Sequence, residues 1–289
     1  AAMNDPPSEP DSSSEPDSSG DEVASRLKAA IEFAQAAGDF TLGYFRQPGL
    51  EVIRKGDGSP VTEADRGAEQ LLRARIQERF PSDAILGEEF GESPGTSGFR
   101  WVLDPIDGTK SFIHGVPLYT TLVAVMDQRK RDSEGDPLIG VIHSPATQET
   151  VSAAVGGGCW LRDSGAEPRA AVVSTVDSLD QALFLTTDSA DFARRTSADA
   201  TIYPNLQQAC RLSRTWGDAY GYLMVATGRA EVMIDAKLSL WDAAALKPVI
   251  EEAGGVFCDW QGVPTVHSGD AIATNGIITS EVLARTRGR

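Results

Sequence analysis

The most informative stretch of the chain is Trp101-Val102-Leu103-Asp104-Pro105-Ile106-Asp107-Gly108-Thr109. Its apolar start predicts a buried strand, and its proline and glycine predict a turn where that strand ends. The strand delivers two carboxylates onto the turn, so Asp104, Asp107 and the Ile106 carbonyl can converge on a hard cation. Oxygen ligands at this density suit Mg²⁺, which is commonly held by a few carboxylates and a substrate phosphate.

The end of this stretch also favours a phosphate, because Gly108 and Thr109 would begin the next element with free backbone N–H groups. Isolated Asp-Pro and Asp-Gly pairs are common turn signals. A specified run such as residues 104–109, however, arises by chance in a chain of this length on the order of once in 10⁵. The run therefore predicts a functional site.

Around this stretch, hydrophobic periodicity predicts a layered α+β fold. A first helix follows the capping-box pattern from Ser19 to Glu22, and a second starts after residues 59–62 and ends near 80. Runs typical of strands lie at 84–86, 101–103, 120–126, 138–142 and 151–155, with a hairpin loop at 127–137. The second half has strands at 182–186, 231–234 and 256–260, and helices at 220–227, 242–253 and near 281. Consecutive strands with irregularly placed helices favour α+β over a regular βαβ winding.

Length and composition agree with a globular protein of about two domains. Of 289 residues, 41% are hydrophobic and 24% charged, which excludes a wholly disordered, collagen-like or disulfide-scaffold chain. Residues 1–22 contain seven acids and no base, and they predict a disordered acidic tail. An N-terminal half at 23–165, carrying most candidate ligands, and a C-terminal half at 166–289 follow.

Charge and cysteine usage narrow the class of partner. Without the tail, 35 acids face 26 bases, a net charge of −9, which disfavours a nucleic-acid or anionic-membrane binder. The three cysteines are far apart and form no CxxC pair, so neither a zinc ribbon nor a disulfide framework is indicated. With no long apolar run and no signal-peptide pattern, a cytoplasmic protein is expected.

Four separated motifs together resemble the inositol monophosphatase-like family of metal-dependent phosphomonoesterases. They are residues 55–65, the Gly87-Glu88-Glu89 segment, residues 104–109 and Trp241-Asp242-Ala243-Ala244, in that order. The similarity covers residues 23–285. It implies the layered αβαβα sandwich of the inositol monophosphatase and fructose-1,6-bisphosphatase type, and a homodimer.

Carried over residue by residue, the resemblance implies two to three Mg²⁺ ions. One is held by Glu88, Asp104 and the Ile106 carbonyl, and a second by Asp104, Asp107 and Asp242, with a third, weaker ion near Glu88. The phosphate is expected at Asp107, Gly108 and Thr109. Catalysis is assigned to Glu88, Thr109 and Asp65, where Thr109 and Asp65 orient the attacking water.

Each of these side chains also has a structural explanation when taken alone. Asp65 stands at capping-box spacing from Thr62, and Asp242 precedes a predicted helix, where an acid favours the macrodipole. Glu88 is compatible with a solvated strand end and Lys55 with a surface lysine. It is their joint occurrence that favours the metal site.

Substrate choice must depend on residues that touch the leaving group. Asp235 stands where the family places a substrate-contacting acid, and Asp218 stands where inositol-preferring members have a small hydroxyl or apolar residue. Two acids beside an anionic cluster favour a cationic substrate. The run Trp-Gly-Asp-Ala-Tyr-Gly-Tyr at 216–222, together with residues 108–113, resembles the histidinol-phosphatase branch most. Arg214 and Lys55 complete the expected substrate contacts.

The predicted function is Mg²⁺-dependent hydrolysis of L-histidinol phosphate, a small-molecule ester, to L-histidinol and phosphate in histidine biosynthesis. The alternatives are an inositol-1-monophosphatase or broad sugar phosphatase and, in a different class, a non-catalytic cation or metabolite sensor. A sensor is expected to have a damaged ligand set, whereas the ligand set here is intact.

Overall fold

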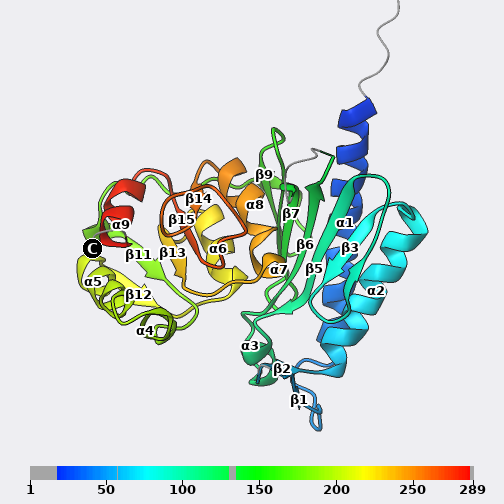
Figure 1. Ribbon diagram of the computed structural model, residues 1–289, viewed down its shortest axis with the longest axis horizontal. Coiled ribbons are helices and arrows are strands. Elements are labelled where there is room, and N and C mark those ends of the chain that lie inside the picture. The colour runs from blue at the N-terminus through cyan, green and yellow to red at the C-terminus, as the bar shows by residue number, and fades with distance from the viewer. Residues whose placement is uncertain (1–17, 57, 130–134, 287–289) are drawn as a thin grey trace, which may run out of the picture.

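The computed structural model describes residues 18–56, 58–129 and 135–286 (Figure 1). Most of the expected acidic tail, residues 1–17, therefore lies outside the described residues, as do Asp57 and part of the expected hairpin loop, residues 130–134. Helix α1 (Ser18–Leu42) already includes the last five residues of that tail. Asp21 lies in its first turn, where a negative charge stabilises a helix. The predicted cap by the Ser19 side chain also lies outside what the structure describes.

An eight-stranded sheet is formed by seven strands of the expected N-terminal half and one short strand, residues 169–170, from the start of the expected C-terminal half (Figure 1). Its strands lie in the order β10-β9-β8-β7-β6-β5-β3-β4, and only β3 and β5 pair in parallel. Their bounds are β3 (Ala84–Gly87), β4 (Gly91–Ser93), β5 (Phe99–Asp107), β6 (Thr120–Asp127), β7 (Asp136–Ser144), β8 (Glu149–Ala154), β9 (Cys159–Asp163) and β10 (Arg169–Ala170). A short hairpin of β1 (Ile53–Arg54) and β2 (Pro60–Val61) stands beside α3 (Thr109–Ile113).

A β-bulge interrupts the pairing of β5 with β6 at the predicted site. Asp104 pairs with Leu122 and Asp107 pairs with Thr120, so three steps along β5 match two along β6. Pro105, which has no N–H group to donate, lies in the extra stretch. In a regular strand, residues three apart point to opposite faces, and one extra residue returns them to the same side.

Two helices cover one face of this sheet. Helix α1 packs on β6, β7 and β8, and α2 (Glu63–Arg79) packs on β5 and on α1. Helix α2 begins at the predicted place because Thr62 caps it, and Thr62 and Asp65 form the capping box reciprocally. Buried apolar residues of both helices meet those of the sheet in one cluster that includes Phe33, Leu72 and Trp101.

A second layer of helices covers the opposite face and separates the first sheet from a second one. Helices α6 (Ala219–Ala226), α7 (Leu240–Ala243) and α8 (Leu246–Glu252) lie there. The single helix predicted at 242–253 is therefore two helices. Pro248 explains the break, because it cannot donate a hydrogen bond to the Ala244 carbonyl four residues earlier.

The second sheet has five strands in the order β12-β11-β13-β15-β14. They are β11 (Leu183–Leu185), β12 (Leu212–Arg214), β13 (Val232–Asp235), β14 (Val256–Cys258) and β15 (Ala271–Thr274). Its outer face packs on α4 (Asp191–Arg195), α5 (Ile202–Ala209) and α9 (Thr279–Thr286), with one-turn helices η1 (Leu179–Gln181) and η2 (Asp199–Thr201) alongside. The predicted α+β fold with αβαβα layering is confirmed (Figure 1).

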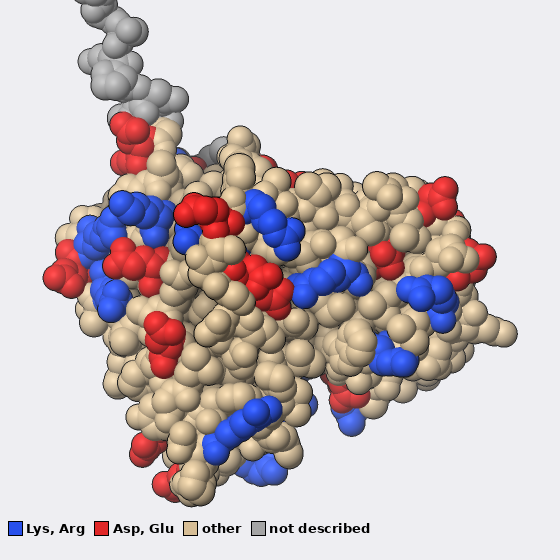
Figure 2. Space-filling model, turned by 180° about the vertical axis from the view of Figure 1, so that it is seen from behind, with Lys and Arg blue, Asp and Glu red and all other residues tan. Residues whose placement is uncertain are grey.

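Among the described helices, none combines the length and apolar character needed to cross a bilayer. On the face seen in Figure 2, basic and acidic side chains are interspersed over both halves of the molecule. That face has no continuous basic surface of the kind that binds nucleic-acid backbones.

Candidate active site

Three acidic side chains from the two halves of the chain converge on one point. Asp104 and Asp107 come from the bulged end of β5, and Asp242 comes from the first turn of α7. Each offers a carboxylate oxygen, and these oxygens all lie within 4.8 Å of one another. Hard oxygen donors at such distances fit a divalent cation of the Mg²⁺ type.

The electrostatics of this cluster also fit a cation. Burial raises the pKa of Asp104 well above its usual value, and the charges of Glu88, Asp107 and Asp242 raise it further. Burial also raises the pKa of Asp107 well above its usual value, and the negative charges of Asp218 and Asp242 raise it further. Burial raises the pKa of Asp242 to about 6. Buried like charges are costly unless a counter-ion lies among them.

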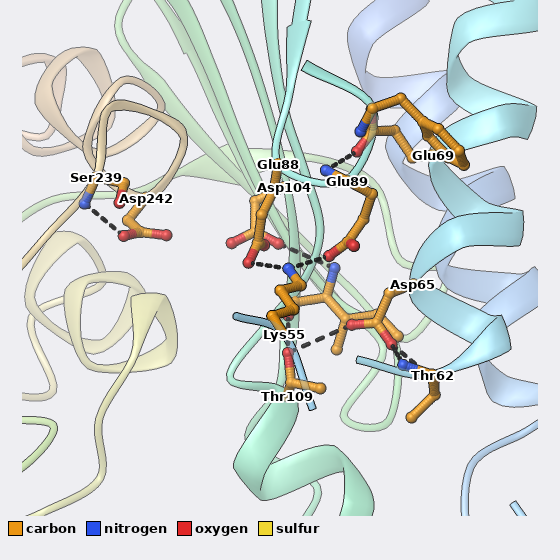
Figure 3. A network of polar contacts seen from close by, with 12 residues as sticks. Lys55, Thr62, Asp65, Glu69, Glu88, Glu89, Asp104, Thr109, Ser239 and Asp242 are labelled. Atoms are coloured by element: carbon orange, nitrogen blue, oxygen red, sulfur yellow. Dashed lines mark hydrogen bonds and ion pairs between the residues drawn. The ribbon is translucent and has the colours of Figure 1, made fainter. Parts of the chain in front are cut away.

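Glu88 and Lys55 form the other side of the site (Figure 3). Glu88 follows β3, and its backbone N–H donates to the Leu103 carbonyl on β5 at 3.2 Å. The Lys55 ammonium lies 2.8 Å from Glu88 Oε1 and 2.5 Å from Glu89 Oε1. Burial lowers the pKa of Lys55, but its bonds to the two glutamates outweigh burial and raise that pKa. Lys55, expected from sequence at the substrate, is thus directed at two carboxylates.

The turn after β3, which carries Glu88 and Glu89, is held by a buried glutamate that no sequence motif indicated. Glu69 of α2 accepts hydrogen bonds from the backbone N–H groups of Glu89 at 2.7 Å and Phe90 at 3.2 Å. Arg73 Nε donates to Glu69 at 2.8 Å. A Cβ on Gly87 would overlap the Glu69 carboxylate, so the turn needs glycine there. The spacing of Glu69 and Arg73, four residues apart on a predicted helix, is the sequence signal that indicates this pair.

Thr109 connects the end of β5 to the start of α2. Its hydroxyl lies 3.1 Å from the Ile106 carbonyl and 3.3 Å from Asp65 Oδ1. The other oxygen of Asp65 accepts hydrogen bonds from the Thr62 N–H and hydroxyl groups at 2.7 and 2.6 Å. Asp65 therefore caps α2 and also contacts Thr109. Its position is compatible with both roles considered from sequence, the helix cap and the orientation of water together with Thr109.

The cluster opens into a cavity of about 780 Å³. Its lining includes Glu88, Asp104, Ile106, Asp107, Gly108, Thr109, Asp218 and Asp242. Burial raises the pKa of Asp218 to about 7, and the charges of Asp235 and Asp242 act in the same direction.

Two residues expected at the substrate are placed differently among the described residues. Asp235 is buried at the end of β13 and does not line the cavity. The Arg214 side chain is exposed and donates to the Ser213 carbonyl at 2.7 Å. The lining also includes Asp188, Asp191 and Arg194, and Arg194 pairs with both of these acids. No motif indicated these three residues, because α4 and the loop before it meet the cavity only in the tertiary structure.

Known proteins with similar sequences and structures identify the family to which this chain belongs. Residues 22–288 match the model of the inositol monophosphatase family. A histidinol-phosphatase of Chlorobaculum parvum is 41% identical over 86% of this chain and 91% of its own, and one of Mycobacterium tuberculosis is 37% identical over 90% and 96%. An inositol monophosphatase structure from Zymomonas mobilis is 31% identical with a TM-score of 0.78, covering 91% of this chain and 98% of that one. The chain belongs to the inositol monophosphatase family.

Proposed function

We propose that this protein is a Mg²⁺-dependent phosphomonoesterase that hydrolyses L-histidinol phosphate to L-histidinol and phosphate in histidine biosynthesis. The observation that carries the reaction class is the meeting of Asp104, Asp107 and Asp242 at the base of an open cavity. Two observations support the assignment of the substrate. Asp218 lines that cavity, and the chain is similar to proteins named histidinol-phosphatase.

Glu88, Asp104, Asp107, Asp242 and the Ile106 carbonyl would hold two to three Mg²⁺ ions. When bound, such ions activate water, neutralise phosphate charge and stabilise the leaving alkoxide. The residues of the chain then have positioning and proton-handling tasks. Gly108 and Thr109, at the start of α3, receive the phosphate beside Asp107.

Thr109 and Asp65 orient the attacking water. The Thr109 hydroxyl has one proton to donate, and both of its neighbours, Asp65 Oδ1 and the Ile106 carbonyl, are acceptors. Its oxygen lone pairs are therefore left to accept a hydrogen bond from the water, which aims the water at phosphorus. Thr62 fixes Asp65 by two hydrogen bonds and so fixes the direction of Thr109.

Asp218 selects the leaving group. Its carboxylate lies in the cavity, and its pKa is raised to about 7 by burial and by neighbouring acids, so a cation beside it would be favourable. Histidinol brings an ammonium group and an imidazole, whereas inositol and sugars bring only hydroxyl groups. The cationic ester is accordingly the preferred substrate.

A substrate panel with and without Mg²⁺ tests this function. We expect Mg²⁺-dependent phosphate release that is faster for histidinol phosphate than for inositol 1-phosphate or glycerol 2-phosphate. Asp218→Asn should lower kcat/KM for histidinol phosphate by roughly tenfold or more, the worth of a buried charge contact, and should affect glycerol 2-phosphate much less. Asp180→Asn, an exposed acid outside the cavity, is the control. Equal losses of kcat/KM on both esters would contradict the proposed choice of substrate. Phosphate release without Mg²⁺ would contradict the proposed Mg²⁺-dependent reaction.

Inositol phosphate hydrolysis is the second candidate, since solved structures similar to this chain are inositol monophosphatases. The same panel separates the two, because a preference for inositol 1-phosphate would favour it. We further propose that the protein is a homodimer and that it is located in the cytoplasm. Light scattering of the purified protein would test the dimer by its molar mass. The buried thiols Cys159 and Cys210 suit a reducing compartment.

A further inference from the structure

Asp218 has a backbone conformation that is unusual for a residue with a side chain. Its φ is 49° and its ψ is −159°, a combination that glycine adopts readily and other residues rarely. Three other described non-glycine residues have positive φ, namely Arg46, Gln148 and Ser164, and none of them lines the cavity. Since strained residues persist only where their surroundings hold them, the structure around Asp218 must supply that hold.

Two hydrogen bonds fix the backbone on either side of the strained position. The Asp218 N–H donates to Thr187 Oγ1 at 2.9 Å, and the next N–H, that of Ala219, donates to Asp107 Oδ2 at 2.6 Å. A Cβ built on Gly108 would lie only 2.8 Å from Asp218 Oδ2. The Asp218 carboxylate is thus held beside the Gly108 turn at the wall of the cavity.

Thr187 is itself held by Asp235. Asp235 is only 3% exposed, and its Oδ1 accepts the Thr187 N–H at 2.9 Å. Its Oδ2 accepts the hydroxyl of Tyr222 at 3.2 Å, and Tyr222 lies one helical turn after Asp218 on α6. Asp235 therefore ties the loop after β11 to the helix that begins at Asp218, and both of its oxygens are engaged in doing so.

We propose that Asp235 is a positioning residue, which acts through Thr187 and Tyr222 to hold the strained Asp218 at the leaving-group side of the cavity. This inference rests on the proposed function, in which Asp218 meets a cationic leaving group. It assigns to Asp235 a role different from the direct substrate contact that its sequence position suggested. Specificity for the cation then depends on Asp235, a residue that does not line the cavity.

Isosteric variants test the inference on two esters, histidinol phosphate and glycerol 2-phosphate. Tyr222→Phe and Thr187→Val each remove one hydrogen bond of this network, and each should lower the ratio of kcat/KM values for the two esters by roughly 3- to 10-fold. Tyr220→Phe is the matched control, because Tyr220 lies on the same helix and donates to Glu149 instead. In an Asp218→Asn background, Tyr222→Phe should change the ratio no further. Proportional losses on both esters, or an unchanged ratio, would overturn the inference.

A second measurement needs no substrate. Asp218→Gly should raise the midpoint of thermal unfolding, because glycine relieves the strain. In a Thr187→Val background the residue can already relax, so the same substitution should give a smaller gain. Equal gains in both backgrounds would overturn the positioning role. If the wild type instead shows no preference for the cationic ester, the proposed substrate fails, and this stability cycle still decides whether the network holds Asp218.

Discussion

Asp104 is 2% exposed and shares its surroundings with three other acids that raise its pKa after burial has raised it. In the absence of a cation, such a cluster favours protonated carboxyl groups and opposes folding at neutral pH. The residues that suit a metal are therefore residues that cost the metal-free protein stability. This trade can be measured without any assay of activity.

Asp104→Asn should stabilise the metal-free protein and abolish its response to Mg²⁺. Asparagine keeps the oxygen that accepts the Ile106 N–H at 3.1 Å and removes one buried charge. Unfolding in EDTA at pH 8 should cost on the order of 1 kcal/mol more than in the wild type. Mg²⁺ at 100 times its Kd should stabilise the wild type by about 2.7 kcal/mol and the variant far less. A variant that is still stabilised like the wild type would exclude Asp104 as a ligand.

The pH dependence of the same two proteins has a defined sign. Acids whose pKa is raised on folding bind more protons in the folded state, so stability is present below the unfolded pKa of about 4 and is lost as the pH rises through the folded values. Those values are about 6 for Asp242 and about 7 for Asp218. In EDTA the wild type should therefore lose more stability between pH 5.5 and pH 8 than Asp104→Asn does, as calorimetry at the two pH values would show.

His143 contributes the opposite dependence in a lower range. Burial lowers its pKa from 6.5 to about 4, partly opposed by Asp39. Its Nδ1 lies 2.9 Å from Thr150 Oγ1, and its buried Nε2 has no hydrogen-bond partner among the described atoms. The folded state resists protonation that the unfolded state accepts, so stability should fall as the pH decreases from about 6.5 to 4, by about 2 kcal/mol at pH 5. His143→Gln should remove that dependence, and exposed His267→Gln should retain it; denaturant titrations at pH 7 and pH 5 would reveal either outcome.

At the scale of the element, α2 and the turn after β3 act as one unit. Glu69 holds the turn by two backbone N–H groups, and the same turn presents Glu88 to the site (Figure 3). The charge of Glu69 is compensated by Arg73, whose guanidinium also contacts the Gly91 carbonyl. A substitution at Glu69 should therefore shift the turn and, with it, the position of Glu88 at the candidate metal site.

Glu69→Gln should weaken Mg²⁺ binding several-fold, because an amide cannot accept both N–H groups as the carboxylate does. Titration calorimetry of the purified protein would give the Kd directly. Glu78→Gln makes the same chemical change at an exposed position of the same helix and should leave the Kd unaltered. An unchanged Kd in Glu69→Gln would show that the turn keeps its shape without the buried carboxylate.

At the scale of the molecule, the two halves share one core. Apolar residues of the first sheet, among them Val102 and Ile142, are buried in one cluster with Leu246 and Val249 of α8. The approach is close, since a Cβ on Gly140 of β7 would overlap the Ala245 carbonyl. The cluster of Asp104, Asp107 and Asp242 likewise combines side chains from both halves. We therefore propose that residues 23–165 and 166–289 are halves of a single cooperative unit.

Cooperative unfolding is the test of that proposal. Far-UV circular dichroism and tryptophan fluorescence should give the same unfolding midpoint, since Trp101 lies in the first half and Trp260 in the second. Mg²⁺ should shift both signals together. Two separated transitions, or a Mg²⁺ shift confined to one of them, would mean that the halves fold independently.

Local sequence signals were enough to predict the main elements around β5 and the acidic residues of the candidate metal site. Helix α2 begins where the Thr62 capping box predicts, and the strands around β5 lie where apolar runs predict, because both signals are local. The predicted ligands Asp104, Asp107 and Asp242 are close in space, but their spacing along the chain could not show how. A bulge brings two of them to one side of β5, and packing of α7 brings the third.

The roles of the other acidic residues depend on contacts that form only in the folded chain. Asp235 and Asp218 are both expected from sequence at the substrate, yet Asp235 is buried and bonded to Thr187 and Tyr222, whereas Asp218 lines the cavity. Lys55 meets Glu88 and Glu89, and Glu69 supports their turn, through contacts between residues some 20 to 34 positions apart. Burial and hydrogen-bond partners set the state of an ionisable group, and they depend on distant segments that the order of residues does not reveal.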